Sequence, residues 1–364
     1  MRTDGATLEQ RLLERIRAEG PITFAAFMEA ALYDPHHGFY ARPPIGPAGD
    51  FVTSPHVSPA FGDLLARQLA ECWELLGRPD PFVVAEAGAG DGTLARRIAE
   101  ASIEPVARAM RYVAIERSPG ALAALRSAGI EASERLPGPV HVVLANELLD
   151  NLPFHRLRER GGHAVEVLVG HTGERLVEVE GEPSPEALAP LDRPLEPGEE
   201  RPVSPAALSF VDDIAAAVPR GYAFLIDYGF EPGERTGEVH SYRSHRVTGD
   251  VLAEPGSRDV TAAVDLGAIA ARAARAGLGT WGPVSQRDAL LGLGMRLWLR
   301  GLRARRADAE REGDHRLAMR LWGAISRASI LVDEGKLGGL KVLVLGTEGL
   351  PAPAAALGDP ETGC

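Results

Sequence analysis

The chain has 364 residues, of which 45% are apolar and 25% charged, and its formal net charge is −12. This composition is that of a globular protein with one large α/β domain or two domains. The acidic balance argues against binding to nucleic acid or an anionic membrane. Two cysteines, Cys72 and Cys364, form neither a disulfide framework nor a metal site. Without a signal-peptide pattern or an apolar run of membrane-spanning length, we expect a cytoplasmic protein.

Residues 1–78 are expected to form an N-terminal helical cap. Helical periodicity covers residues 7–18, 23–32 and 58–76. A long Gly- and Pro-rich loop precedes the last helix, and such loops inside compact chains are usually functional. It contains Gly49-Asp50-Phe51-Val52-Thr53-Ser54-Pro55. We expect Asp50, Phe51 and Ser54 to fold over a bound cofactor, and a purely structural turn is the alternative.

Residues 79–350 are expected to form an open α/β sheet with helices between the strands. The strands are predicted at 82–87, 111–116, 130–133, 140–147, 221–229, 278–285 and 341–345. The helices are predicted at 93–101, 119–128, 205–218, 262–276, 287–304 and 306–331. Insertions are expected near 155–205, as a β-hairpin (164–169 and 175–180) with a surface loop, and near 286–335. The Ala- and Pro-rich tail 351–364 is expected to be disordered.

The turn after the first strand of this sheet carries the pattern Glu86-x-Gly88-x-Gly90-x-Gly92. Glycine suits a sharp bend that a ligand approaches closely. A dinucleotide fingerprint is G-x-G-x-x-G, so the third glycine comes one residue early. A carboxylate here suits the ammonium group of S-adenosylmethionine (SAM) better than a diphosphate. The predicted cofactor residues are therefore Glu86, Gly88, Ala89, Gly90 and Gly92, with a dinucleotide or an empty turn as alternatives.

Ligands of open α/β sheets lie beyond the carboxyl ends of the strands. Glu116 ends the second strand, where a carboxylate can accept both hydroxyl groups of a ribose, and Arg117 follows it. NAD enzymes and SAM enzymes share this geometry, so it predicts a nucleoside without selecting the cofactor. A solvated glutamate at a strand end is the alternative.

The fourth and fifth strands end in Asn146-Glu147-Leu148-Leu149-Asp150-Asn151-Leu152-Pro153 and Asp227-Tyr228-Gly229. Methyl transfer requires an acceptor aligned with the S–CH3 bond and stabilisation of positive charge. A carboxylate paired with a guanidinium group does both. We therefore predict Glu147, then Asp227 and Asp150, as catalytic residues, with Asn146 beside the cofactor. Helix capping by Asn146 and a turn capped by Asp227 are the structural alternatives.

Other chemistries find no support in the sequence. The histidines lack metal-ligand spacing with cysteine or carboxylate residues, so no metal is expected. Neither a P-loop nor a G-x-S-x-G motif is present, which excludes those phosphate-binding and hydrolase classes.

The Gly-Asp-Phe loop, the glycine turn, the Asn-Glu motif and Asp227-Tyr228-Gly229 occur in this order. This combination resembles the MidA family of class I SAM-dependent methyltransferases, over about Ile22 to Leu345. The resemblance implies a Rossmann-like SAM-binding core, a helical cap with the Gly-Asp-Phe loop and an inserted lobe. It also implies methyl transfer to a nitrogen of a protein side chain, an arginine where the acceptor is known.

Two competing interpretations remain at this point. One is an NAD-dependent oxidoreductase, which the early third glycine disfavours. The other is a non-catalytic assembly factor that retains the fold, which the complete acidic set disfavours. The sequence leaves the acceptor protein and the oligomeric state, including a homodimer, open.

Overall fold

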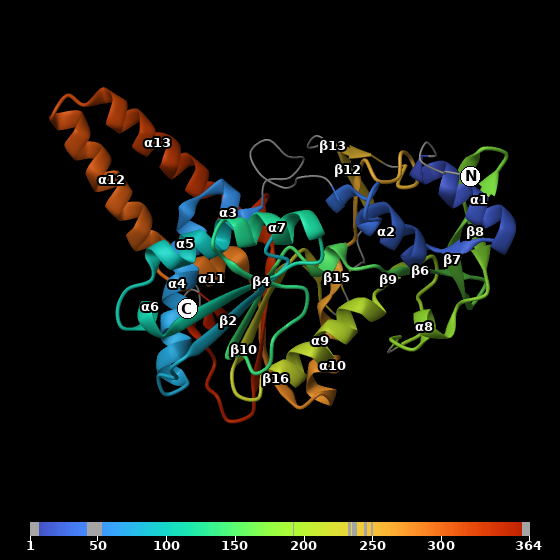
Figure 1. Ribbon diagram of the computed structural model, residues 1–364, viewed down its shortest axis with the longest axis horizontal. Helices are drawn as coiled ribbons and strands as arrows, with labels where there is room; N and C mark the ends of the chain where they lie inside the picture. The colour runs from blue at the N-terminus through green and yellow to red at the C-terminus, as the bar shows by residue number, and fades with distance from the viewer. Residues whose placement is uncertain are drawn as a thin grey trace.

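The computed structural model describes residues 7–41, 53–191, 193–231, 234, 239–243, 246–248 and 250–358. Within this part of the chain, a seven-stranded sheet in the order β16-β17-β10-β5-β2-β3-β4 forms the centre (Figure 1). Its strands are β2 (Phe82–Ala87), β3 (Met110–Ile115), β4 (Glu131–Ser133), β5 (Val142–Asn146), β10 (Tyr222–Asp227), β16 (Leu278–Ser285) and β17 (Lys341–Thr347). Strand β17 is antiparallel to both neighbours, and the other pairs are parallel. The carboxyl ends of β2, β3, β5 and β10 therefore meet at one edge.

Helices cover both faces of this sheet because its strands are apolar on both sides. One face packs against α4 (Pro59–Leu75), α5 (Thr93–Ala101) and α11 (Gln286–Gly292), and the other against α9 (Pro205–Ala217) and α10 (Leu266–Arg275). Successive side chains of a strand point to opposite faces of the sheet. Val84 therefore packs in the core on the side of α4 and α5, and Val83 in the core on the side of α9 and α10. Helices α6 (Val106–Ala109) and α7 (Pro119–Ser127) lie in the connections that flank β3.

A smaller lobe joins the start of the chain to the first insertion, on the right in Figure 1. Its sheet has the order β1-β7-β6-β9, with β8 paired to β7. The elements are α1 (Leu8–Glu19), β1 (Ile22–Thr23), α2 (Phe24–Tyr33), η1 (Phe39–Ala41), β6 (His155–Arg160), β7 (His163–Thr172), β8 (Arg175–Gly181), α8 (Pro185–Leu188) and β9 (Glu200–Val203). Phe24 and Phe27 are fully buried in its core. The N-terminal helices thus share a core with the insertion.

Several other elements of the described chain are short. They are α3 (Ser54–Val57), η2 (Leu149–Asn151), β11 (Gly229–Phe230), β12 (His240–Arg243), β13 (Arg246–Thr248), β14 (Asp259–Thr261), β15 (Val264–Asp265), η3 (Leu337–Gly339) and α14 (Ala354–Leu357).

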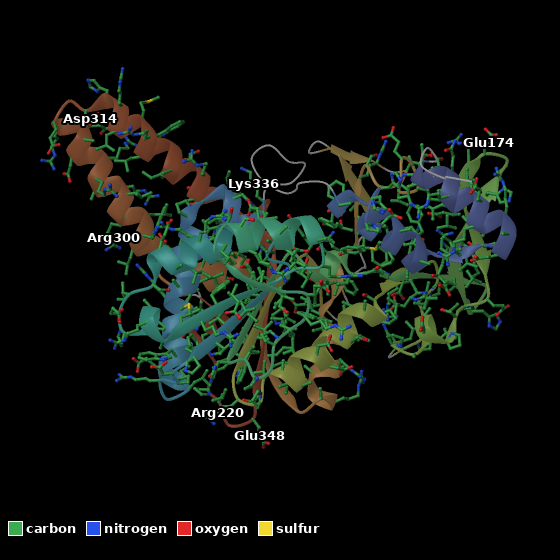
Figure 2. All side chains as sticks on the ribbon, viewed as in Figure 1. Glu174, Arg220, Arg300, Asp314, Lys336 and Glu348 are labelled. Carbon is green, nitrogen blue, oxygen red and sulfur yellow. The ribbon has the colours of Figure 1, made fainter. Side chains whose placement is uncertain are left out.

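Two long antiparallel helices, α12 (Met295–Arg311) and α13 (His315–Ile330), project from the sheet domain as an arm (Figure 1). Figure 2 marks Arg300 and Asp314 on this arm and Glu174 at the opposite end of the molecule. No helix in the described ranges is both long and apolar enough to cross a membrane.

Three local predictions need correction. The expected surface loop 182–205 contains α8 and β9, whose residues pair with the insertion sheet. The region predicted as helices 287–304 and 306–331 holds three helices, because Gly294, at φ 98°, ends one and begins the next. The stretch 230–258, for which the sequence predicts a polar loop, contains β12 and β13.

The tail prediction is wrong for residues 351–358, which are ordered against the core. Ala355 and Ala356 are buried, and the Ala355 N–H donates to Gln68 Oε1 at 2.8 Å. The Ala354 N–H donates to Glu71 Oε2, and the carbonyl of Pro351 accepts the Tyr222 hydroxyl. Residues 359–364 lie outside the described part.

Ending the chain after Leu350 should lower its stability. The truncation removes these three hydrogen bonds and exposes apolar surface, so we expect a loss of about 2 to 4 kcal/mol in the free energy of unfolding. Urea unfolding measures it, and a chain ending after Gly358 is the matched control. Equal midpoints for the two truncations would contradict the packing of α14.

Candidate active site

A cavity of about 1130 Å³ opens at the carboxyl edge of the sheet, between it and the smaller lobe. Its lining is strongly acidic. The acidic lining residues are Glu116, Glu134, Glu147, Asp150, Asp213 and Asp259, against the two arginines Arg117 and Arg135. Such a lining favours cations over phosphates.

The glycine turn after β2 has the backbone conformation that its sequence predicts. Gly88, Gly90 and Gly92 have φ values of 72°, 55° and 76°, in the left-handed region that glycine adopts without strain. Gly88 lines the cavity, and a Cβ atom there would lie 3.0 Å from Leu148 Cδ1. The turn therefore brings bare backbone to the cavity wall.

Glu116 lies at the end of β3 and lines the same cavity. Its Oε2 accepts the N–H of Gly90 at 3.1 Å, and its Oε1 accepts the N–H groups of Arg117 and Ser118. These bonds fix the carboxylate and leave one lone pair, on Oε2, for a ligand hydroxyl. The Arg117 guanidinium also lines the cavity, stacks over the Tyr33 ring and pairs with Glu29.

Four of the five predicted cofactor residues in this turn, namely Glu86, Ala89, Gly90 and Gly92, are buried and do not line the cavity. Glu86 is 5% exposed and does not line the cavity, because its Oε2 accepts the Tyr112 hydroxyl at 2.8 Å beneath the turn. Burial raises the pKa of Glu86 to about 8, so it is largely neutral near pH 7. Ala89 is buried as well. The predicted carboxylate–ammonium contact at Glu86 therefore has no geometric support.

Glu147 is held in a left-handed conformation, φ 49°, directly after β5. Its N–H donates to the Ile226 carbonyl, and its Oε1 accepts both the Ser54 N–H and the Asn146 side-chain amide, each at 3.1 Å. Glu147 lines the cavity. Asn146 does not line it, and its side-chain amide instead orients the Glu147 carboxylate. Burial raises the pKa of Glu147 to about 7.

Asp227 does not reach the cavity, so the structure corrects the expectation that it contacts the acceptor. Its Oδ2 accepts the N–H groups of Leu148 at 3.0 Å, Leu149 at 2.7 Å and Asp150 at 3.4 Å, and its Oδ1 accepts that of Tyr228. The residue thus caps η2, a segment 77 to 79 positions earlier, whereas the structural alternative from the sequence was a cap of its own Tyr228-Gly229 turn. Burial raises its pKa, and these N–H groups oppose the shift.

Asp150 is 7% exposed and lines the cavity. Its Oδ1 has no hydrogen-bond partner in the described structure. Ser54 is buried and contributes its N–H to Glu147 and its hydroxyl to Gln286 Oε1. Asp50 and Phe51 lie outside the described residues.

Sequence reasoning missed one wall of the cavity. Tyr40 donates to Asn151 Oδ1 at 2.9 Å and contacts Asp259, which also accepts the Asn151 amide at 3.1 Å. Tyr33 stacks on Tyr40 and donates to the Asn151 carbonyl. No local motif links these residues, because they lie up to 219 positions apart.

Comparisons with known proteins identify the family. Residues 64–284 match the model of a family of S-adenosyl-L-methionine-dependent methyltransferases. The chain belongs to this family. This confirms the MidA-type resemblance and SAM as the cofactor, and it decides against an NAD-dependent oxidoreductase and a non-catalytic scaffold.

The chain is similar to two curated relatives of this kind. The mitochondrial protein arginine methyltransferase NDUFAF7 homolog of Drosophila melanogaster is 32% identical over 71% of this chain and 68% of its own length. The human mitochondrial protein arginine methyltransferase NDUFAF7 is 27% identical over 80% of this chain and 74% of its own length. These mitochondrial relatives contradict the predicted cytoplasmic location.

A solved structure supports the fold and the cofactor. The crystal structure of a COG1565 superfamily member from Burkholderia thailandensis, bound to S-adenosyl-homocysteine, is 28% identical and has a TM-score of 0.82. The structural alignment covers 98% of this chain and 96% of the Burkholderia chain. The Rossmann-like class I fold is thereby confirmed. The bare glycine backbone and the fixed carboxylate of Glu116 at the cavity fit this nucleoside.

Replacing Gly88 by alanine should weaken binding of S-adenosylhomocysteine at least about tenfold, since a methyl group would press on Leu148 and enter the cavity wall. Gly129→Ala is the matched control, because Gly129 has φ 76° but no atom within 4 Å of an added Cβ. Calorimetric titration measures both affinities. Equal losses in the two variants would assign the effect to backbone strain alone.

Glu147 should make stability depend on pH. Its folded-state pKa of about 7 exceeds its ordinary value of 4.5, so its contribution is fully present below about pH 4.5 and is lost as pH rises through 7. Glu147→Gln should therefore gain about 1 to 3 kcal/mol over the wild type between pH 5 and pH 8.5. Urea unfolding across this range measures it, and parallel profiles would contradict the burial of this carboxylate.

Proposed function

We propose that this methyltransferase acts on a nitrogen of a protein side chain, and that the acceptor is an arginine of a partner protein. The observation that carries the proposal is the Glu147 carboxylate, which lines an acidic cavity at the end of β5. A planar guanidinium group pairs with such a carboxylate through two parallel hydrogen bonds. The named activity of the relatives, protein arginine methylation, supports the same acceptor.

On the cofactor side, the proposed binding residues are Gly88, Gly90, Gly92, Glu116 and Arg117. Glu116 would accept a ribose hydroxyl at Oε2, and the glycine turn would pass closely along the nucleoside. Asn146 and Ser54 would act indirectly, by holding Glu147. Bound SAM supplies the electrophilic methyl group of the reaction.

On the acceptor side, Glu147 is proposed to orient the guanidinium group and to stabilise its positive charge. Both of its bonds within the described structure go to Oε1, so Oε2 has no partner there. Fixing an acceptor in line with the transferred group accounts for a large share of catalysis in two-substrate reactions. Asp227 is proposed to position this turn rather than to touch the acceptor.

Amidated peptides with one arginine or one lysine test the acceptor. With labelled SAM, the wild type should methylate the arginine peptide, as mass spectrometry of the product would show. Glu147→Gln should lower kcat about 100-fold or more while binding of S-adenosylhomocysteine is unchanged. Glu134→Gln, which removes an exposed carboxylate from the same cavity, is the matched control and should stay within about threefold. Methylation of lysine alone would refute the arginine assignment.

A further inference from the structure

Asp150 carries the clearest unexplained polar atom at the cavity. Asp150 is 7% exposed and lines the cavity; its side chain hydrogen-bonds with the carboxyl group of Asp227, yet Oδ1 has no hydrogen-bond partner among the described residues. A buried polar atom without a partner destabilises a protein, and native structures rarely keep one without a function. The atom therefore points to a ligand group that is absent from the chain itself.

The surroundings of Asp150 are almost wholly acidic or neutral. The facing groups come from β10, β14, the turn after β5 and η1, and they are Asp227, Asp259, Glu147 and Tyr40. Burial, followed by the charges of the three carboxylates, raises the pKa of Asp150 well above its usual range. Asp227 is the carboxylate of this cluster that receives four backbone N–H groups, so it holds the negative charge and Asp150 holds the proton.

We propose that Asp150 is a second acceptor-binding carboxyl group, which loses its proton when a guanidinium group enters the cavity beside Glu147. This inference rests on the proposed function. A guanidinium group has five N–H donors, more than one carboxylate can accept. Asp150 Oδ1, which has no partner within the described residues, would accept a further one.

Charge balance supports this arrangement. Acceptor and methyl donor each bring one positive charge into a cavity of low polarity, and two ionised carboxylates, Glu147 and Asp150, neutralise them. During transfer the S–CH3 bond breaks and an N–CH3 bond forms, so the sulfur becomes neutral. The methylated nitrogen must then lose a proton. Asp150 takes this proton back, which restores its neutral state and leaves one carboxylate for the product guanidinium.

Calorimetry at pH 8 tests the inference without turnover. The protein is loaded with sinefungin, whose ammonium group replaces the charged sulfonium of SAM and which has no methyl group to transfer, and is titrated with an acetylated, amidated Gly-Arg-Gly peptide in two buffers of different ionisation enthalpy. The inference predicts that the wild type releases about one proton per bound peptide, which comes from Asp150 because Glu147, with a pKa of about 7, is already mostly ionised. Asp150→Asn should release none and bind about tenfold more weakly or worse.

Thermal unfolding separates this role from a structural one. Asp150→Asn should raise the Tm of the free protein, because it removes a carboxyl group that the neighbouring charges destabilise. Asp227→Asn should lower the Tm, because that side chain caps four backbone N–H groups. A lower Tm for Asp150→Asn would make Asp150 a structural residue and overturn the inference.

The remaining outcomes separate the inference from the proposed function. If Asp150→Asn binds the arginine peptide with wild-type affinity and proton release, the inference fails and the proposed function stands. If the wild type binds the arginine peptide no better than a Gly-Lys-Gly peptide, the proposed function fails, and the inference fails with it.

Discussion

The carboxylate of Asp227 is the constraint on which the site depends. It ends β10 and receives the N–H groups of Leu148, Leu149 and Asp150 from the turn that follows β5. The same turn is tied to β10 by the bond from the Glu147 N–H to the Ile226 carbonyl. These bonds hold Glu147 at a positive φ that a glutamate rarely adopts. Two neighbouring strands of the sheet thus fix the direction in which the acidic side chains point.

The resulting site is acidic because the carboxyl ends of parallel strands converge. Glu116 follows β3, Glu147 and Asp150 follow β5, and β14 adds Asp259 on the side of the smaller lobe. Such a field repels the diphosphate of a dinucleotide and attracts a sulfonium or a guanidinium group. The same electrostatic argument therefore explains both the choice of cofactor and the proposed choice of acceptor. After burial, the charges of neighbouring carboxylates also contribute to the raised pKa values of Glu147 and Asp150.

Sequence reasoning succeeded where the signal is local. The continuous apolar run of β2, the glycine turn and helix α5 follow from neighbouring residues, and the predicted bounds 82–87 and 93–101 match the structure. It failed where partners are distant. Asp227 resembled an acceptor-side carboxylate because its four N–H partners include three that lie 77 to 79 positions earlier. Glu86 resembled a ligand because nothing in its own segment reveals the Tyr112 hydroxyl. The sequence predicted one helix where α11 and the start of α12 lie, because the sequence does not reveal that Gly294 adopts a positive φ.

A crystal structure with S-adenosylhomocysteine and an arginine peptide would test the central claim most directly, namely that the rigid turn after β5 presents carboxylates to a cationic acceptor. We expect a ribose hydroxyl against Glu116 and the guanidinium group against Glu147, with the four bonds of Asp227 unchanged. A guanidinium group bound elsewhere, with Glu147 turned away or covered by the cofactor, would contradict the account.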